Sequence, residues 1–228
     1  MQKERFLILV VALFVFLIVR SFLTHFGYSA NFIQVLEYIL FFSCLIAVSE
    51  KKSHLYIALF LFGAAVAARA VIFFSGENLY FLPAKSCELV FSALFFAYTC
   101  FLITAFVLQD GKVTRDRLAA AICVYMLIGV TWGMFFALLE ITAPGSLSTG
   151  LKSPGSDVEQ EAMYFSFVTL TTLGYGDISP ISPPARTLAI LEAILGQIYV
   201  AVMIARLVGL HIADAARKSK PTDTGSPE

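Results

Sequence analysis

The chain has 228 residues, of which 59% are hydrophobic and 14% are charged, whereas soluble domains contain roughly 45–50% apolar and about 25% charged residues. This composition excludes an ordinary soluble domain and indicates a membrane protein. The 16 basic and 16 acidic residues balance to a formal net charge of zero, so no overall field attracts nucleic acid.

Six apolar stretches approach the length, roughly 20 residues, that a helix needs to cross a bilayer. They are residues 6–23, 31–49, 54–74, 86–108, 118–139 and 184–210. The first follows Lys3 and Arg5, but no small-residue cleavage site comes after it, so it predicts a retained helix rather than a signal peptide. The predicted fold class is an all-α integral membrane protein with six transmembrane helices.

A seventh apolar segment, residues 158–171, is too short to cross a bilayer and predicts a re-entrant helix surrounded by protein. The stretch before it, residues 141–157, is rich in Gly, Pro and Ser and predicts an exposed loop. The two segments together separate the fifth predicted helix from the sixth.

Basic residues set the expected orientation of these helices. One set of loops, together with both termini, holds ten Lys and Arg residues, and the other set holds three. Both termini are therefore expected in the cytoplasm. The loop that contains the re-entrant segment is then extracellular, and it carries acidic residues that would concentrate cations: Asp157, Glu159, Glu161 and Asp177.

Residues 169–177 read Thr-Leu-Thr-Thr-Leu-Gly-Tyr-Gly-Asp. The part from Thr172 to Asp177 resembles the selectivity filter of the potassium-channel family, which has the form T-V/I/L-G-Y-G-D. Its context is also similar, with a short aromatic-rich helix before it, Pro180 after it and a spanning helix on each side. The resemblance covers about residues 118–212, and the four preceding helices match six-helix members of the family only in number.

Backbone chemistry explains why such a motif binds ions. Gly174 and Gly176 adopt left-handed backbone angles at little cost, so residues of alternating hand can turn successive carbonyls to one side. In a homotetramer, four such strands, one from each chain, would surround a dehydrated K⁺. Each strand would contribute the Thr172 hydroxyl and the carbonyls of Thr172, Leu173, Gly174 and Tyr175. The side chains of Leu173 and Tyr175 are expected to point away from the ion and pack against the pore helix, whose C-terminus near Thr171 would favour a cation.

Two departures from the commonest family pattern concern the support of this filter. Many relatives have paired tryptophans where this chain has Tyr164 and Phe165, and some bacterial relatives have a carboxylate where it has Val168. Asp177 therefore needs another partner. The position of Tyr164 predicts that its hydroxyl binds Asp177, with Val168 and Thr171 completing the support.

The last predicted helix carries features of a gate. Gly196 lies where relatives often have a glycine that lets the inner helix bend, and close packing against another helix is the alternative. Glu192 and Arg206 are expected to contact helix five or the pore helix. Four residues share a stripe on the other side, which is expected to line an apolar cavity that closes by dewetting: Gln197, Val200, Ile204 and Val208.

The first four helices lack the pattern of a voltage sensor, because no basic residue occurs from Cys87 to Gln109. Unpaired charges are costly inside a membrane, so the charges that do occur predict a salt-bridged cluster, with a ligand or proton sensor as the alternative. Each is expected in the outer half of one helix: Arg20, Glu37, Arg69 and Glu88.

These inferences divide the chain into a four-helix domain at residues 1–110 that does not sense voltage, a pore domain at 111–215 and a disordered cytoplasmic tail at 216–228. The resemblance implies passive, potassium-selective conduction by a homotetramer in a cell membrane, and the short loops favour a bacterial inner membrane. The alternatives are a non-selective cation channel on the same pore fold and a membrane subunit of a potassium transporter.

The sequence predicts no enzyme activity, because it has no Ser/His/Asp set, metal-ligand spacing or phosphate-binding loop. Its cysteines form no CxxC pattern and no cluster with histidine, which argues against a metal site or disulfide framework: Cys44, Cys87, Cys100 and Cys123. No cofactor is expected apart from K⁺ in the filter. The expected partners are K⁺, three identical subunits and lipid, without nucleic acid.

Overall fold

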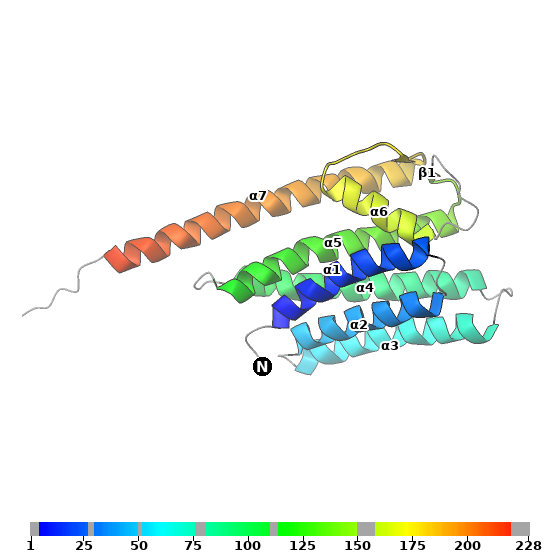
Figure 1. Ribbon diagram of the computed structural model, residues 1–228, viewed down its shortest axis with the longest axis horizontal. Coiled ribbons are helices and arrows are strands. Elements are labelled where there is room, and N and C mark those ends of the chain that lie inside the picture. The colour runs from blue at the N-terminus through cyan, green and yellow to red at the C-terminus, as the bar shows by residue number, and fades with distance from the viewer. Residues whose placement is uncertain are drawn as a thin grey trace, which may run out of the picture.

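The computed structural model describes residues 5–26, 30–49, 52–75, 81–109, 114–149 and 158–219 (Figure 1). In those ranges the chain forms seven helices and two short strands. In chain order they are α1 (Arg5–His25), α2 (Ala30–Val48), α3 (Lys52–Ser75), α4 (Phe81–Val107), α5 (Arg115–Thr142), β1 (Leu147–Thr149), α6 (Val158–Leu170), β2 (Ile178–Pro180) and α7 (Pro183–Ser219).

Five of the described helices are long and apolar enough to cross a membrane, namely α1, α3, α4, α5 and α7. Helix α2 has a shorter apolar stretch, Phe32–Val48. All six predicted spanning segments are therefore helical, but only five reach the full length. Helix α6 has 13 residues, or about 20 Å at a rise of about 1.5 Å per residue. It is too short to span, as predicted for residues 158–171.

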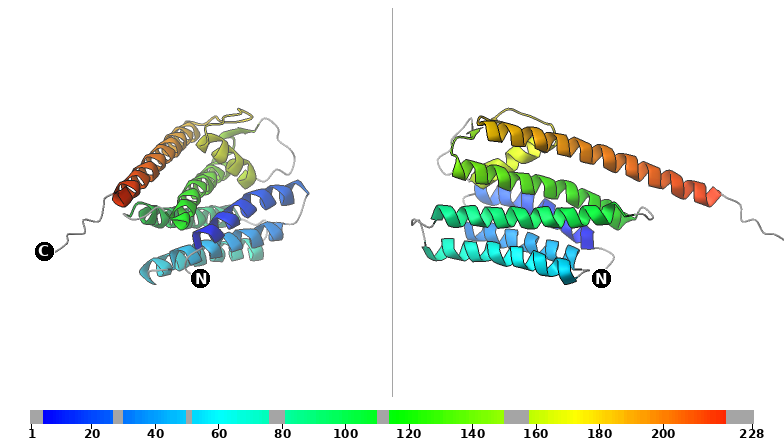
Figure 2. Two further views of the ribbon diagram at one scale, coloured as in Figure 1. Left: turned by 60° about the vertical axis from the view of Figure 1, so that its left-hand side comes forward. Right: turned by 180° about the vertical axis from the view of Figure 1, so that it is seen from behind.

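Helix α5 lies at the centre of the arrangement. In the most apolar 18-residue stretch of α5, 67% of the residues are buried, whereas the corresponding share is 17% in α3 and in α7. It contacts α1 and α4 on one side and α6 and α7 on the other (Figures 1 and 2). Its first turn is capped by Thr114, whose hydroxyl accepts a hydrogen bond from the amide of Arg117 at 3.2 Å.

The first four helices share a core with α5 that is rich in phenylalanine. The ring of Phe41 on α2 lies 4.7 Å from that of Phe95 and 4.8 Å from that of Phe96, measured between centroids. Both α4 rings are fully buried. Close-packed aromatic pairs of this kind add to the energy of burial, so α4 links α2 and α3 firmly to α5.

A small residue lets α6 approach α5 closely. A Cβ atom at Gly133 of α5 would lie 3.0 Å from the Cα atom of Met163 on α6. This distance is tighter than nearly all real Cβ contacts, so a larger residue would force the Met163 backbone to shift by a few tenths of an ångström. Gly133 thus determines how deeply α6 lies against α5.

The predicted exposed loop contains regular structure. Its residues Leu147–Thr149 form β1, which pairs antiparallel with β2 in the register Leu147 opposite Pro180, while residues 150–157 lie outside the described ranges. The carboxylate of Glu140 accepts hydrogen bonds from the amides of Gly145 and Leu147 at 2.7 and 2.9 Å. The two-stranded ribbon therefore ties the segment after residue 177 to the end of α5.

Helix α7 is much longer than predicted. Its 37 residues correspond to about 55 Å, and its C-terminal part extends away from the other helices (Figure 2). The tail predicted as disordered from residue 216 is helical as far as Ser219, and residues 220–228 lie outside the described ranges. The polar composition of residues 217–219 did not end the helix, because Lys, Arg and Ser are compatible with helical backbone.

Candidate functional site

Helix α6 positions the segment that contains the filter-like motif. It lies between α5 and the first part of α7 (Figure 2). Glu159 and Glu161 occupy its first turn, where carboxylates interact favourably with the positive end of the helix dipole. Its buried residues hold it in place: Ala162, Met163, Phe165, Ser166, Val168 and Leu170.

Carbonyl groups at the C-terminus of α6 bind the start of the motif. The carbonyl of Val168 accepts hydrogen bonds from the amides of Leu173 and Gly174 at 2.9 and 3.3 Å. The amide and the hydroxyl of Thr171 both donate to the carbonyl of Phe167. Helix C-termini leave such carbonyls without helical partners. Val168 and Thr171, the predicted support residues, therefore lie at the junction that ties the motif to α6.

The motif has an alternating backbone. Thr172, Gly174 and Gly176 have φ angles of 57°, 57° and 83°, and the intervening Leu173 and Tyr175 have none in this region. Alternation of left- and right-handed angles turns successive carbonyls toward the same side, as a carbonyl-lined ion pathway requires. The sequence predicted this conformation for the two glycines only. Thr172 adopts it as well, at a steric cost that a non-glycine residue bears.

Two large side chains of the motif are largely exposed within one chain. Leu173 and Tyr175 were expected to pack against the pore helix, but within one chain they are 55% and 67% exposed. The reason is geometric, because the motif runs along the surface of its own subunit. These two large exposed side chains, on either side of Gly174, form an apolar surface that is open to another molecule.

Tyr164 and Asp177 form the predicted hydrogen bond between α6 and the end of the motif. The Tyr164 hydroxyl donates to the Asp177 carboxylate at 2.7 Å. This hydrogen bond raises the pKa of Tyr164 to about 12 and lowers the pKa of Asp177 below its ordinary value of 3.8. Asp177 is therefore ionised at neutral pH. The bond confirms the contact that the sequence predicted from the position of Tyr164.

Two charged residues of α7 point toward the other helices. Glu192 lies 2.5 Å from the hydroxyl of Ser166 on α6, which confirms the predicted contact with the pore helix. Arg206 donates to the carbonyl of Gln109 at 2.7 Å and also to that of Leu108. Arg206 was predicted to contact helix five or the pore helix, whereas these two hydrogen bonds go to carbonyls at the end of α4. The carbonyls that follow a helix end attract its cation instead.

Gly196 lies against the C-terminus of α6. A Cβ atom on it would lie 2.7 Å from both the carbonyl oxygen and the Cδ1 atom of Leu170. The structure therefore contains the close packing that the sequence offered as the alternative to a hinge. Helix α7 also continues without interruption through this position, so bending at Gly196 stays a prediction.

The proposed gate stripe lies on an exposed surface of α7. Val200, Ile204 and Val208 are 37%, 58% and 53% exposed, and Gln197 is exposed as well. The exposed surface is wider than this stripe, since it includes further apolar residues: Ile190, Leu191, Ile194, Leu195 and Ile198. Within one chain α7 thus presents apolar side chains over most of its circumference.

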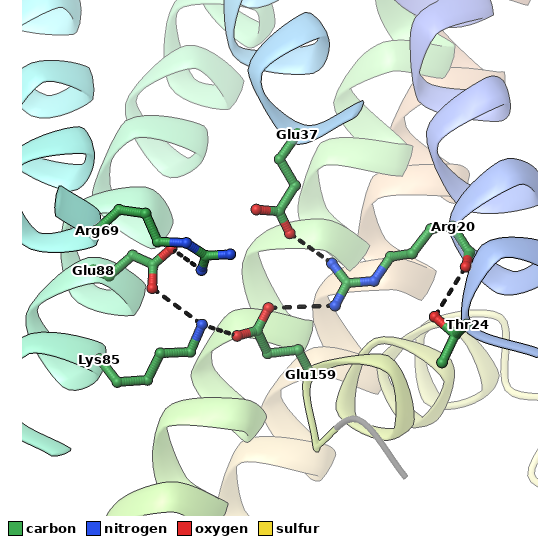
Figure 3. Close-up of polar contacts among 7 residues, drawn as sticks. All are labelled: Arg20, Thr24, Glu37, Arg69, Lys85, Glu88 and Glu159. Carbon is green, nitrogen blue, oxygen red and sulfur yellow. Dashed lines mark hydrogen bonds and ion pairs between the residues drawn. The ribbon is translucent and has the colours of Figure 1, made fainter. Parts of the chain in front are cut away.

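An ion-pair network joins the first four helices to α6 (Figure 3). Arg20 on α1 contacts Glu37 on α2 at 2.8 Å and Glu159 on α6 at 3.3 Å. Lys85 on α4 contacts Glu159 as well. Lys85 and Arg69 both reach Glu88, at 3.0 and 2.5 Å. All four residues predicted for a salt-bridged cluster are therefore in ion pairs.

Lys85 and Glu159 are two members of this network that sequence analysis did not include. Lys85 lies just before the predicted helix at residues 86–108, but α4 begins at Phe81 and includes it. Burial alone would raise the pKa of Glu159, but the charges of Lys85 and Arg20 outweigh burial and lower it to about 2. Glu159 is thus a carboxylate that connects two bases, and it anchors the N-terminal end of α6.

Comparison with known proteins agrees with this geometry. Residues 151–211, which include α6, the filter-like motif and most of α7, match a family model described as an ion channel. The chain is 37% identical to the two pore potassium channel c of Oryza sativa subsp. japonica over 86 residues, which cover 37% of this chain and 16% of the rice protein. No solved structure matches the chain significantly.

Two bacterial proteins are also similar. The inward rectifier potassium channel Kirbac3.1 of Paramagnetospirillum magnetotacticum is 33% identical over 86 residues, covering 33% of this chain and 29% of that protein. Protein LctB of Bacillus caldotenax is 28% identical over 100 residues, covering 42% of this chain and 74% of that protein. The chain thus spans 16% and 29% of the lengths of the two named potassium channels. The matched family is a family of channels and not of enzymes, so residues 151–211 are similar to ion channels, and two of the similar proteins are named as potassium channels.

Proposed function

We propose that the chain forms a homotetrameric channel that conducts K⁺ passively and selectively across a cell membrane. The alternating backbone of residues 172–176 carries this proposal, since it is the conformation in which one strand offers a column of carbonyl oxygens. Two of the similar proteins are named as potassium channels, which supports the choice of ion. The acidic side chains around the motif favour cations over anions.

The exposure of the motif supports a tetramer. One chain supplies one filter strand, and four strands are needed to replace the hydration shell of an ion. Leu173 and Tyr175 are more than half exposed among the described residues, and much of the apolar surface of α7 is exposed as well. Neighbouring copies of the chain would cover both surfaces, with the stripe from Gln197 to Val208 facing the central cavity.

The first four helices act in this proposal as a fixed support. Five of their charged residues form ion pairs with one another or with Glu159, namely Arg20, Glu37, Arg69, Lys85 and Glu88. Arg20, Arg69 and Lys85 are held by carboxylates in this way, and α4 carries no further basic residue that could move in the membrane field. The channel is expected to open without intrinsic voltage dependence, with both termini in the cytoplasm.

The reversal potential of the purified protein in a planar bilayer tests the proposal, with K⁺ on one side and Na⁺ on the other. Reversal near the potassium equilibrium potential is the expected result. Reversal near zero would instead indicate a non-selective cation channel. Absence of current from verified tetramers at all voltages and pH values would refute conduction by this chain alone and favour a transporter subunit.

A pair of glycine variants provides a matched control. Gly174 and Gly145 both have positive φ angles, and a Cβ atom at either would meet nothing within 4 Å. Alanine at each position therefore imposes a similar backbone strain, but only Gly174 lies in the motif. Gly174→Ala should abolish selective current, and Gly145→Ala should preserve it. Equal effects of the two variants would show that the motif is not the selective element.

A further inference from the structure

Glu192 is a buried carboxyl group between three helices of the pore region. It belongs to α7, and its side chain is fully buried. Its Oε1 atom lies 2.5 Å from the hydroxyl oxygen of Ser166 on α6. The same hydroxyl oxygen lies 2.7 Å from the carbonyl oxygen of Gly129 on α5. These two contacts connect α7, α6 and α5 through a single hydroxyl group.

In the part of the chain that the structure describes, Glu192 has no basic partner. Among the residues that the structure describes, it forms no ion pair with Lys, Arg or His, and its Oε2 atom is buried without a hydrogen-bond partner. The titratable group that faces it from α5 is Tyr125, whose hydroxyl donates to the carbonyl of Leu170 at 3.2 Å. On α6, the hydroxyl of Tyr164 is bound to Asp177. An ionised Glu192 would thus be an uncompensated charge in an apolar interior, which is strongly unfavourable.

Counting protons assigns the direction of the two hydrogen bonds. A serine hydroxyl has one proton to donate, and a carbonyl oxygen can only accept. If Glu192 were a carboxylate, Ser166 would face two acceptors with one proton, and one of the two short contacts would bring lone pairs together. If Glu192 carries a proton, it donates to Ser166 and Ser166 donates to Gly129. Both contacts are then hydrogen bonds.

We propose that Glu192 is a protonated carboxylic acid at neutral pH and that it acts as a positioning residue for the pore helix. The hydrogen-bond chain from Glu192 through Ser166 to Gly129 joins α7, α6 and α5. Gly196, one helical turn after Glu192 on the same face of α7, contacts Leu170 at the C-terminus of α6. The two contacts hold the helix that presents the motif, and the effect on conduction rests on the proposed channel function.

Infrared spectroscopy of the full-length protein in lipid vesicles tests the protonation directly. The carbonyl stretching band of a buried carboxylic acid should be present at neutral pH and should lose intensity in Glu192→Gln. The control is Glu140→Gln, which removes a carboxyl group that accepts two backbone amide hydrogen bonds at the end of α5 and should leave the band unchanged. If Glu192→Gln leaves the carboxylic acid band as it is in the wild type, the proposal is wrong.

Potassium flux into the same vesicles tests the positioning role separately. Glutamine keeps a hydrogen-bond donor in a side chain of similar size, so Glu192→Gln should retain flux, whereas Glu192→Ala and Ser166→Ala should reduce it. Equal flux in all of these variants would overturn the positioning role. Because the infrared band does not depend on conduction, a protein without flux but with the band would contradict only the channel function.

Discussion

Replacing Gly196 by alanine should weaken the packing of α7 on α6. The added Cβ atom would lie 2.7 Å from both the carbonyl oxygen and the Cδ1 atom of Leu170. Favourable contacts to carbon begin at about 3.5 Å, so one of the helices has to move by nearly 1 Å. Leu170 is fully buried, and its carbonyl belongs to the backbone that precedes the motif. Neither atom can move without displacing α6.

The expected cost follows from two opposing effects. Overpacking a dense interior costs about 1–3 kcal/mol, whereas alanine improves helix propensity over glycine by about 1 kcal/mol. Gly63 in α3 is a matched control, because a Cβ atom there meets nothing within 4 Å. Gly63→Ala should therefore gain only the stability that comes from the higher helix propensity of alanine. The two variants should differ by about 1–3 kcal/mol, with Gly196→Ala the less stable.

Thermal inactivation in detergent measures this difference. Membrane proteins of this size generally unfold irreversibly on heating, so the half-life of folded, monodisperse protein at a fixed temperature is the appropriate quantity. Gly196→Ala should shorten this half-life relative to the wild type, and Gly63→Ala should not. If Gly196→Ala is as long-lived as Gly63→Ala, the contact with Leu170 does not constrain α7, and the reasoning from close packing fails.

Three further predictions concern the motif, the ion-pair network and the gate. Tyr164→Phe removes the donor to Asp177 and should change the time course of current under sustained activation; an unaltered time course would show that this hydrogen bond does not stabilise the motif. The pKa of Glu159 is lowered from an ordinary value of 4.5 to about 2, so its ion pairs stabilise the protein fully above about pH 4.5 and lose this effect as the pH falls toward 2. Thermal half-lives of the wild type should therefore decline over that pH range. Glu159→Gln lacks the carboxylate that pairs with Lys85, so it should be less stable than the wild type at neutral pH. Its half-life should also not show the decline that comes from protonation of Glu159. Ile204→Asn should leave the closed pore leaky to K⁺ in vesicle flux assays, because a polar side chain opposes dewetting; a tight closed state would place the gate elsewhere.

Local chemistry was sufficient to predict much of this protein. Runs of apolar residues predicted all six long helical segments, because a helix in lipid satisfies its own backbone hydrogen bonds. The short length of residues 158–171 predicted a helix that does not span. Gly174 and Gly176 predicted left-handed backbone angles, which the structure contains. Each of these inferences depends on neighbours in sequence or on the properties of single residue types.

Tertiary structure decided which distant residues meet. Lys85 and Glu159 are 74 positions apart, and nothing in their local sequence indicated that both would join Arg20 in one network. The contact of Glu192 with Ser166 depends on the angle at which α6 crosses α7, and that of Arg206 depends on where α4 ends. The pairing of β1 with β2 likewise joins segments on either side of α6.

The physical reason for this division is the range of the interactions involved. Hydrophobic transfer into lipid and backbone conformation act within a residue or a helical turn, so the sequence by itself determined the membrane class, the helices and the conformation of the motif. Ion pairs and hydrogen bonds between helices depend on distances of about 3 Å between side chains. Only the packed arrangement of α1, α2, α4, α6 and α7 sets those distances, so only the tertiary structure could place Glu159 and Glu192 at the two ends of the support of α6.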